Sequence, residues 1–176
     1  ASDLGVTNAN DQQLVVVAYI LGFGAPQLVF GPLADRFGRR PVLFASLAGY
    51  ALTGLACMVA PSFSVLLGAR FVQGVFAAGC RVVAVTVVRD AYAGRGMART
   101  MSLVMTVFMV VPILAPSIGQ LILFVAPWRA CFGVLTAAGA LMLGWPMARL
   151  PETLPVESRR ALDLRSLAGA YAQVLG

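Results

Sequence analysis

A short charged run between two long apolar runs is the feature that most constrains this chain. Residues 31–40 read Gly-Pro-Leu-Ala-Asp-Arg-Phe-Gly-Arg-Arg, so four of these ten residues are charged. The uncharged stretches on either side, residues 12–34 and 41–69, each exceed the roughly 20 apolar residues that a helix needs to cross a bilayer. A cationic turn between two such helices is typical of a membrane protein that is anchored by its charged loops.

The composition excludes an ordinary soluble domain. Hydrophobic residues make up 60% of the chain and charged residues only 11%, whereas a soluble domain carries about 25% charged residues. There are too few polar residues to cover a soluble core, so we expect the lipid bilayer to be the main partner. The net charge of +6 comes from thirteen arginines spread mostly over the ends of apolar runs. No basic face forms, and we expect no nucleic-acid binding.

Cysteine and histidine exclude most site chemistry. The three cysteines, Cys57, Cys80 and Cys131, lie inside apolar runs without Cys-x-x-Cys spacing, and the chain has no histidine. An ordinary metal site and Ser–His or Cys–His catalysis therefore cannot be built from these residues. The sequence predicts neither a metal nor an enzyme.

The apolar runs predict five membrane-spanning helices, at residues 14–33, 41–60, 65–88, 100–125 and 130–148. Only helices and closed barrels satisfy their backbone in lipid, so short turns between these spans predict an all-α transmembrane bundle over residues 1–148. Residues 149–176 differ: a proline-containing linker precedes apolar residues at helical spacing. This pattern predicts an amphipathic helix on the membrane surface or against the bundle.

The arginines predict the orientation of the bundle. Ten of them lie in alternate loops or in the tail, and only Arg129 lies in a loop of the other side. Positive residues concentrate on the cytoplasmic side, which predicts a periplasmic N-terminus and a cytoplasmic tail. The ten are Arg36, Arg39, Arg40, Arg89, Arg95, Arg99, Arg149, Arg159, Arg160 and Arg165.

The charged run also resembles the Gly-x-x-x-Asp-Arg-x-Gly-Arg-Arg motif of the major facilitator superfamily of secondary transporters, found after that family's second helix. The resemblance implies a cytoplasmic gate that is latched shut in the outward-facing state. Asp90, at the cytoplasmic end of a later span, would join this cluster. The simpler interpretation is charge anchoring alone, but anchoring does not need the glycines or the aspartate. The expected gate residues are Gly31, Asp35, Arg36, Gly38, Arg39, Arg40 and Asp90.

Further segments resemble other motifs of the superfamily. The Arg-x-x-Gln-Gly pattern at residues 70–74 is similar to one in the family's fourth helix. Ala115-Pro116-Ser117-Ile118-Gly119 resembles the antiporter motif of the fifth helix, with Ala115 in place of the usual glycine. Segments 87–92 and 150–155 resemble the Bcr/CflA branch, the drug:proton antiporters of bicyclomycin and chloramphenicol resistance.

Two arginines inside a predicted span are candidates for coupling. An arginine in the middle of a membrane helix costs about 2.5–3.5 kcal/mol on insertion scales. Arg70 and Arg81 lie near three full turns apart and share a helical stripe with Gly74. Arg70 lies near the outer surface and could snorkel, whereas Arg81 is deeper and is expected to face a polar interior cavity. With Gln73 and Gly74, these arginines form the expected translocation set.

The positions of the acidic residues indicate that the predicted spans do not supply a proton-carrying carboxylate. All seven lie in loops, at helix ends or in the tail, and none lies inside a predicted span. The proton-carrying carboxylate of an antiporter is therefore expected outside these spans. The resemblance implies that the chain lacks the family's first helix and second half, which would be its partners.

The resemblance as a whole implies part of a bacterial inner-membrane secondary transporter. It would export small apolar or amphipathic compounds by proton antiport and alternating access, with a proton gradient and no cofactor. Tyr50, Met105 and Met109 are candidates for lining its pocket. Two alternatives remain: an uptake or metabolite transporter of the same superfamily, and a structural membrane subunit without a transport cycle. A buried Arg81 argues against the structural subunit, because a purely structural helix has no need of a buried charge.

Overall fold

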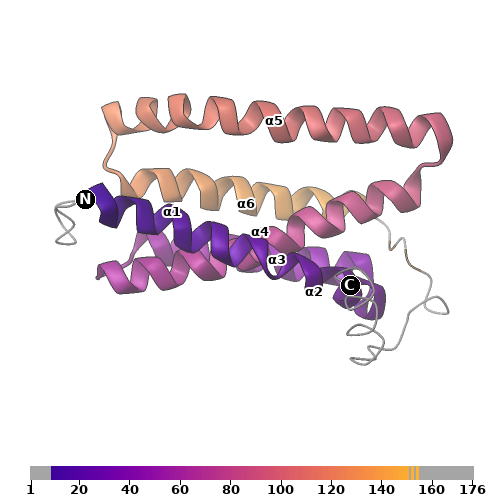
Figure 1. Ribbon diagram of the computed structural model, residues 1–176, viewed down its shortest axis with the longest axis horizontal. Helices are drawn as coiled ribbons and strands as arrows, with labels where there is room; N and C mark the ends of the chain where they lie inside the picture. The colour runs from indigo at the N-terminus through magenta and orange to yellow at the C-terminus, as the bar shows by residue number, and fades with distance from the viewer. Residues whose placement is uncertain (1–8, 151, 153, 155–176) are drawn as a thin grey trace, which may run out of the picture.

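The computed structural model describes residues 9–150 together with residues 152 and 154. These residues form six helices that run largely along one common axis (Figure 1). This part of the chain contains no strand, which confirms the predicted all-α architecture. The helices are α1 (Ala9–Gly24), α2 (Gln27–Phe37), α3 (Arg39–Met58), α4 (Phe63–Ala91), α5 (Gly94–Val125) and α6 (Arg129–Arg149).

The first predicted span is bent rather than continuous. The sequence predicts one helix over residues 14–33, whereas the structure has α1 and α2 joined at residues 25–26 with a bend of 44°. Pro26 explains the break, because proline has no backbone N–H and disfavours helical geometry in the residue before it. Helices α3, α4, α5 and α6 are each long and apolar enough to cross a bilayer, and the bent pair can count as a fifth span.

The charged run is almost entirely helical, which differs from the expected loop. α2 continues through Phe37 and α3 starts at Arg39, so only Gly38 separates the two helices. Gly38 has a φ of 100°, a backbone conformation that residues with a Cβ rarely adopt. The charged side chains are therefore held by the last turn of one helix and the first turn of the next.

Helix α4 lies at the centre of the packing. It contacts α1, α2, α3 and, to a smaller extent, α5, while α6 packs mainly against α3. Gly22 and Gly74 bring the backbones of α1 and α4 together, because a Cβ on either glycine would meet backbone atoms of the other helix. α5 begins six residues before its predicted start at residue 100 and has no buried residue. It lies along one edge of the molecule (Figure 1).

The two ends of the bundle are distinguished by their connections. At one end, the Arg129 guanidinium donates to the carbonyl oxygens of Met58 at 2.9 Å and Ala60 at 3.2 Å, which ties the α5–α6 turn to the α3–α4 turn. The opposite end holds the α2–α3 junction and the C-terminal ends of α4 and α6 (Figure 1). The amphipathic helix predicted within residues 149–176 falls largely outside the described residues.

Candidate functional site

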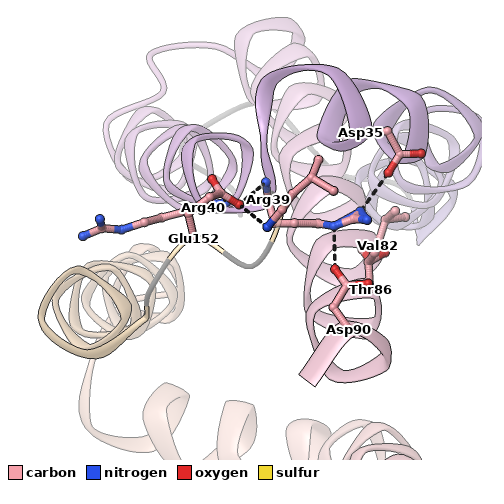
Figure 2. A network of polar contacts seen from close by, with 8 residues as sticks. Asp35, Arg39, Arg40, Val82, Thr86, Asp90 and Glu152 are labelled. Atoms are coloured by element: carbon pink, nitrogen blue, oxygen red, sulfur yellow. Dashed lines mark hydrogen bonds and ion pairs between the residues drawn. The ribbon is translucent and has the colours of Figure 1, made fainter. Parts of the chain in front are cut away.

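Arg39 is the centre of a polar network at the end of the bundle that carries the α2–α3 junction. Its Nε donates to Asp90 Oδ2 at 2.8 Å, and its Nη1 donates to Asp35 Oδ1 at 2.8 Å (Figure 2). The residue is only 8% exposed. A buried guanidinium is stable only when its charge is paired and its donors are bonded. The structure thus brings together three of the predicted gate residues, from the end of α2, the start of α3 and the end of α4.

Glu152 adds a fourth chain segment to this network. Its carboxylate accepts the backbone N–H of Arg39 at 3.0 Å and that of Arg40 at 3.3 Å (Figure 2). These are the first two residues of α3, whose N–H groups have no partner within the helix. A carboxylate at a helix N-terminus also interacts favourably with the helix dipole. The segment that follows α6 is therefore fixed to the start of α3.

The remaining gate residues surround this network in different ways. The Arg40 Nη2 donates to the carbonyl oxygen of Met147 at 3.2 Å, which adds another link to the end of α6. Arg36 is exposed and stacks its guanidinium 5.1 Å from the centre of the Phe37 ring. Gly31 faces open space, since a Cβ there would have no neighbour within 4 Å. Arg36 and Gly31 therefore lie outside the ion-pair network.

Arg70 and Gln73 form a second polar cluster, in α4 near the other end of the bundle. The Arg70 Nη1 donates to Gln73 Oε1 at 2.9 Å, and its guanidinium lies 4.7 Å from the centre of the Tyr19 ring. Gln73 is fully buried. Within the described residues, Gln73 Nε2 and Arg70 Nε are buried without a hydrogen-bond partner. Arg70 is thus directed into the bundle and stacks on α1.

Arg81 faces a cavity of about 480 Å³ that lies between α1, α3, α4, α5 and α6. Its guanidinium lies 5.7 Å from the centre of the Phe23 ring and 5.4 Å from that of Phe108. The rings of Tyr19 and Phe23 are stacked with their centres 6.1 Å apart. Arg70 stacks on Tyr19 and Arg81 on Phe23, so both arginines face α1, in agreement with their predicted position on one stripe of α4. The cavity is largely apolar, however, and not the polar cavity that the sequence led us to expect.

The segment at residues 115–119 that resembles the antiporter motif makes no contact with Arg39, Arg70 or Arg81 among the described residues. Ala115 and Pro116 are exposed on α5, and a Cβ on Gly119 would have no neighbour within 4 Å. Of the predicted pocket residues, Tyr50 lines the cavity, whereas Met105 and Met109 do not.

Several residues of the Arg39 network and of the Arg81 cavity could not be assigned from the sequence alone. The sequence places Glu152 only in a proline-containing linker, although segment 150–155, which resembles a family motif, is a usable signal. Phe23 and Phe108 carry no sequence pattern that distinguishes them from other apolar residues in their spans. Their role follows only from the packing of α1 and α5 around Arg81.

A family model supports an assignment of the whole chain. The model described as Major Facilitator Superfamily matches residues 1–173. The chain belongs to the Major Facilitator Superfamily. It is therefore a multi-pass membrane protein, and its family membership indicates a transport protein rather than an enzyme.

Individual relatives agree with this assignment. The chain is 37% identical over 161 residues to the uncharacterized MFS-type transporter YdgK of Bacillus subtilis, covering 90% of this chain and 40% of YdgK. It is 35% identical over 157 residues to the multidrug resistance protein MdtL of Escherichia coli O157:H7, covering 88% of this chain and 39% of MdtL. The chain therefore spans about two fifths of the length of these curated relatives.

A solved structure supports the fold. The crystal structure of the human organic anion transporter MFSD10 (TETRAN) aligns with a TM-score of 0.74 and 24% sequence identity. The alignment covers 96% of this chain and 40% of that chain. At this level of identity, the comparison shows a shared fold.

Proposed function

We propose that this chain forms part of a proton-driven efflux transporter of the Bcr/CflA type in the bacterial inner membrane. It would work with further helices of the same transporter, since it spans about two fifths of the length of its relatives. The substrate would be a small apolar or amphipathic compound that binds in the cavity beside Arg81. Transport would follow alternating access, in which the two halves rock about a site near the middle of the membrane.

The observation that carries the proposal is the position of Arg39 between Asp35 and Asp90. These contacts join the ends of α2, α3 and α4 at one mouth of the bundle. Because the network is local and partly exposed, it can break without unfolding the helices. A rocking transporter needs such a reversible connection at one mouth while its central cavity opens toward the other.

Sequence relationships support the direction of transport. The MdtL relatives are named multidrug resistance proteins, and segments 87–92 and 150–155 resemble the Bcr/CflA branch. The proposed orientation puts the Arg39 network on the cytoplasmic side, where most of the described arginines lie. The described residues contain no carboxylate midway along a span, so the proton-carrying acid is proposed to lie elsewhere in the transporter.

Drug-induced proton movement in everted membrane vesicles tests the proposal. The full-length transporter would be expressed in cells depleted of their own efflux pumps, and a respiration-driven pH gradient would be followed with a fluorescent amine. Transported compounds should dissipate the gradient, and the same compounds should be less toxic to cells that express the transporter. Asp35→Asn should reduce both effects without abolishing expression. Proton-coupled accumulation of the compounds inside intact cells would contradict efflux and support the uptake alternative.

A further inference from the structure

The cavity beside Arg81 has the size and walls of a small-molecule site. Its volume of about 480 Å³ falls within the range of about 300–1,000 Å³ that is usual for ligand pockets. The walls come from five helices and are mainly apolar, with aromatic rings from α1, α3 and α5. The side chains that determine its chemistry are Tyr19, Phe23, Tyr50, Cys80, Arg81 and Phe108.

Arg81 is the one charged side chain in this lining. Two aromatic rings face its guanidinium, but within the described part of the chain it makes no hydrogen bond or ion pair. Arg70, on the same helix, differs because Gln73 accepts one of its donors. None of the four described carboxylates pairs with Arg81: Asp35 and Asp90 bind Arg39, Glu152 accepts from the start of α3, and Asp11 lies in the first turn of α1.

The arrangement favours an anion attached to an aromatic group. A guanidinium presents a rigid set of five N–H donors that matches a carboxylate or sulfonate in two parallel hydrogen bonds. In a cavity of low dielectric, such a charge-assisted contact is stronger than in water. The rings of Phe23 and Phe108 lie close enough to Arg81 to contact the aromatic part of the same ligand.

We propose that this cavity binds amphipathic aromatic anions, with the anionic group on the Arg81 guanidinium and the aromatic group against Phe23 and Phe108. The inference rests on the proposed function and names the substrate class of the same site. A neutral ligand would leave the Arg81 donors unpaired, and a cationic ligand would meet a like charge. A carboxylate from another part of the transporter, paired with Arg81, would reverse this preference, so the full-length protein is required for the test.

Binding of a matched ligand series to the purified full-length transporter tests the inference. Three naphthalene ligands of similar shape are suitable: 2-naphthoate as the anion, 2-naphthamide as the neutral compound and 2-naphthylmethylammonium as the cation. Calorimetry in detergent at neutral pH would give their dissociation constants. The unmodified protein should bind 2-naphthoate about tenfold or more tightly than 2-naphthamide, as expected for one charge-assisted contact. The cation should bind most weakly.

Variants then locate the preference at Arg81. Arg81→Gln should weaken 2-naphthoate binding about tenfold or more and leave 2-naphthamide binding within about threefold. Arg81→Lys, which keeps the charge, should retain part of the preference. Arg95→Gln is the matched control, because it removes the same charge from an exposed position in the first turn of α5.

Equal or tighter binding of 2-naphthamide or the cation to the unmodified protein would overturn the inference, as would no binding of any of the three ligands. A preference for 2-naphthoate that persists in Arg81→Gln would also overturn it. Binding in detergent needs no proton gradient, so the two proposals can fail separately. Selective 2-naphthoate binding without proton-coupled export would contradict only the proposed function. Proton-coupled export with no anion preference would contradict only this inference.

Discussion

Arg39 Nε donates to Asp90 Oδ2 at 2.8 Å, although the two residues lie 51 positions apart along the chain. The contact joins the first residue of α3 to the last turn of α4. Arg39 is almost completely buried, whereas the Asp90 side chain remains 29% exposed. The ion pair therefore forms where water can reach one partner, and Arg39 keeps its second carboxylate, Asp35, when the contact with Asp90 opens. Both features make the contact reversible.

Asp90→Asn should alter conformation more than stability. The amide removes the negative charge while keeping an oxygen that can accept from Arg39, so we expect the unfolding free energy to change by about 1 kcal/mol or less. Loss of the ion pair should favour opening of the bundle at the end that holds the α2–α3 junction. Thiol labelling of a cysteine placed there should rise about fivefold or more, equivalent to about 1 kcal/mol of conformational preference.

Asp11→Asn is the matched control for this change. Asp11 lies in the first turn of α1, far from the Arg39 network along the helix axis. The control should leave labelling at the end that holds the α2–α3 junction unchanged. Equal labelling of the Asp90 variant and the unmodified protein would count against a gating role for the ion pair.

Glu152→Gln should loosen the start of α3. The carboxylate accepts the backbone N–H groups of Arg39 and Arg40, and also that of Leu154, whereas an amide offers one acceptor oxygen and no charge for the helix N-terminus. Loss of such a cap costs about 0.5–2 kcal/mol. Hydrogen–deuterium exchange of the first turn of α3 should therefore accelerate by about threefold or more. Unchanged exchange in this turn, with normal folding, would contradict the capping role.

The helical architecture could be predicted from local signals, and the contact of Arg39 with Asp90 from the charges at the ends of the predicted spans. Long uncharged runs identify spans, and opposite charges at the ends of neighbouring spans tend to pair. The bend at Pro26 also had a local signal, since a proline interrupts the helical hydrogen bonding. It was missed because the apolar run continues through it without a change in hydropathy.

The setting of Arg81 could not be predicted, because it depends on contacts between distant segments. Phe23 and Phe108 lie 58 and 27 residues away along the chain, and both stack on the same guanidinium. Helical spacing predicted correctly that Arg81 shares a stripe with Arg70. Helical spacing gave no information on which rings of α1 and α5 would face that stripe. That Phe23 and Phe108 line the cavity beside Arg81 is therefore known only from the structure.

The proposed orientation can be tested with cysteines at positions 37 and 62. Phe37 lies at the end of α2 and Ser62 precedes α4, so the two exposed positions mark opposite ends of the bundle. After replacement of Cys57, Cys80 and Cys131, a membrane-impermeant thiol reagent added to intact cells should label position 62 and spare position 37. Permeabilised cells should show labelling at both positions. Labelling of both positions, or of position 37 alone, in intact cells would contradict the orientation.

Gly74→Ala should separate α1 from α4. A Cβ at position 74 would clash with the carbonyl oxygen of Tyr19 and lie 2.9 Å from the backbone nitrogen of Phe23. Backbone atoms cannot rotate away as side chains can, so the helices must move apart, at a cost of about 1–3 kcal/mol. The same movement would disturb the stacking of Arg70 on Tyr19. We expect a lower melting temperature in detergent and weaker binding of cavity ligands.

Gly68→Ala provides the matched control on the same helix. A Cβ at this position would have no neighbour within 4 Å, so the change introduces no clash, and alanine favours a helix over glycine by about 0.5–1 kcal/mol. The control should therefore melt at the same temperature as the unmodified protein or slightly above it. If both variants melted alike, the close approach of α1 and α4 would not be the reason that position 74 holds glycine. A lower melting temperature in Gly74→Ala alone, by contrast, would identify the close approach of α1 and α4 as the reason that position 74 holds glycine.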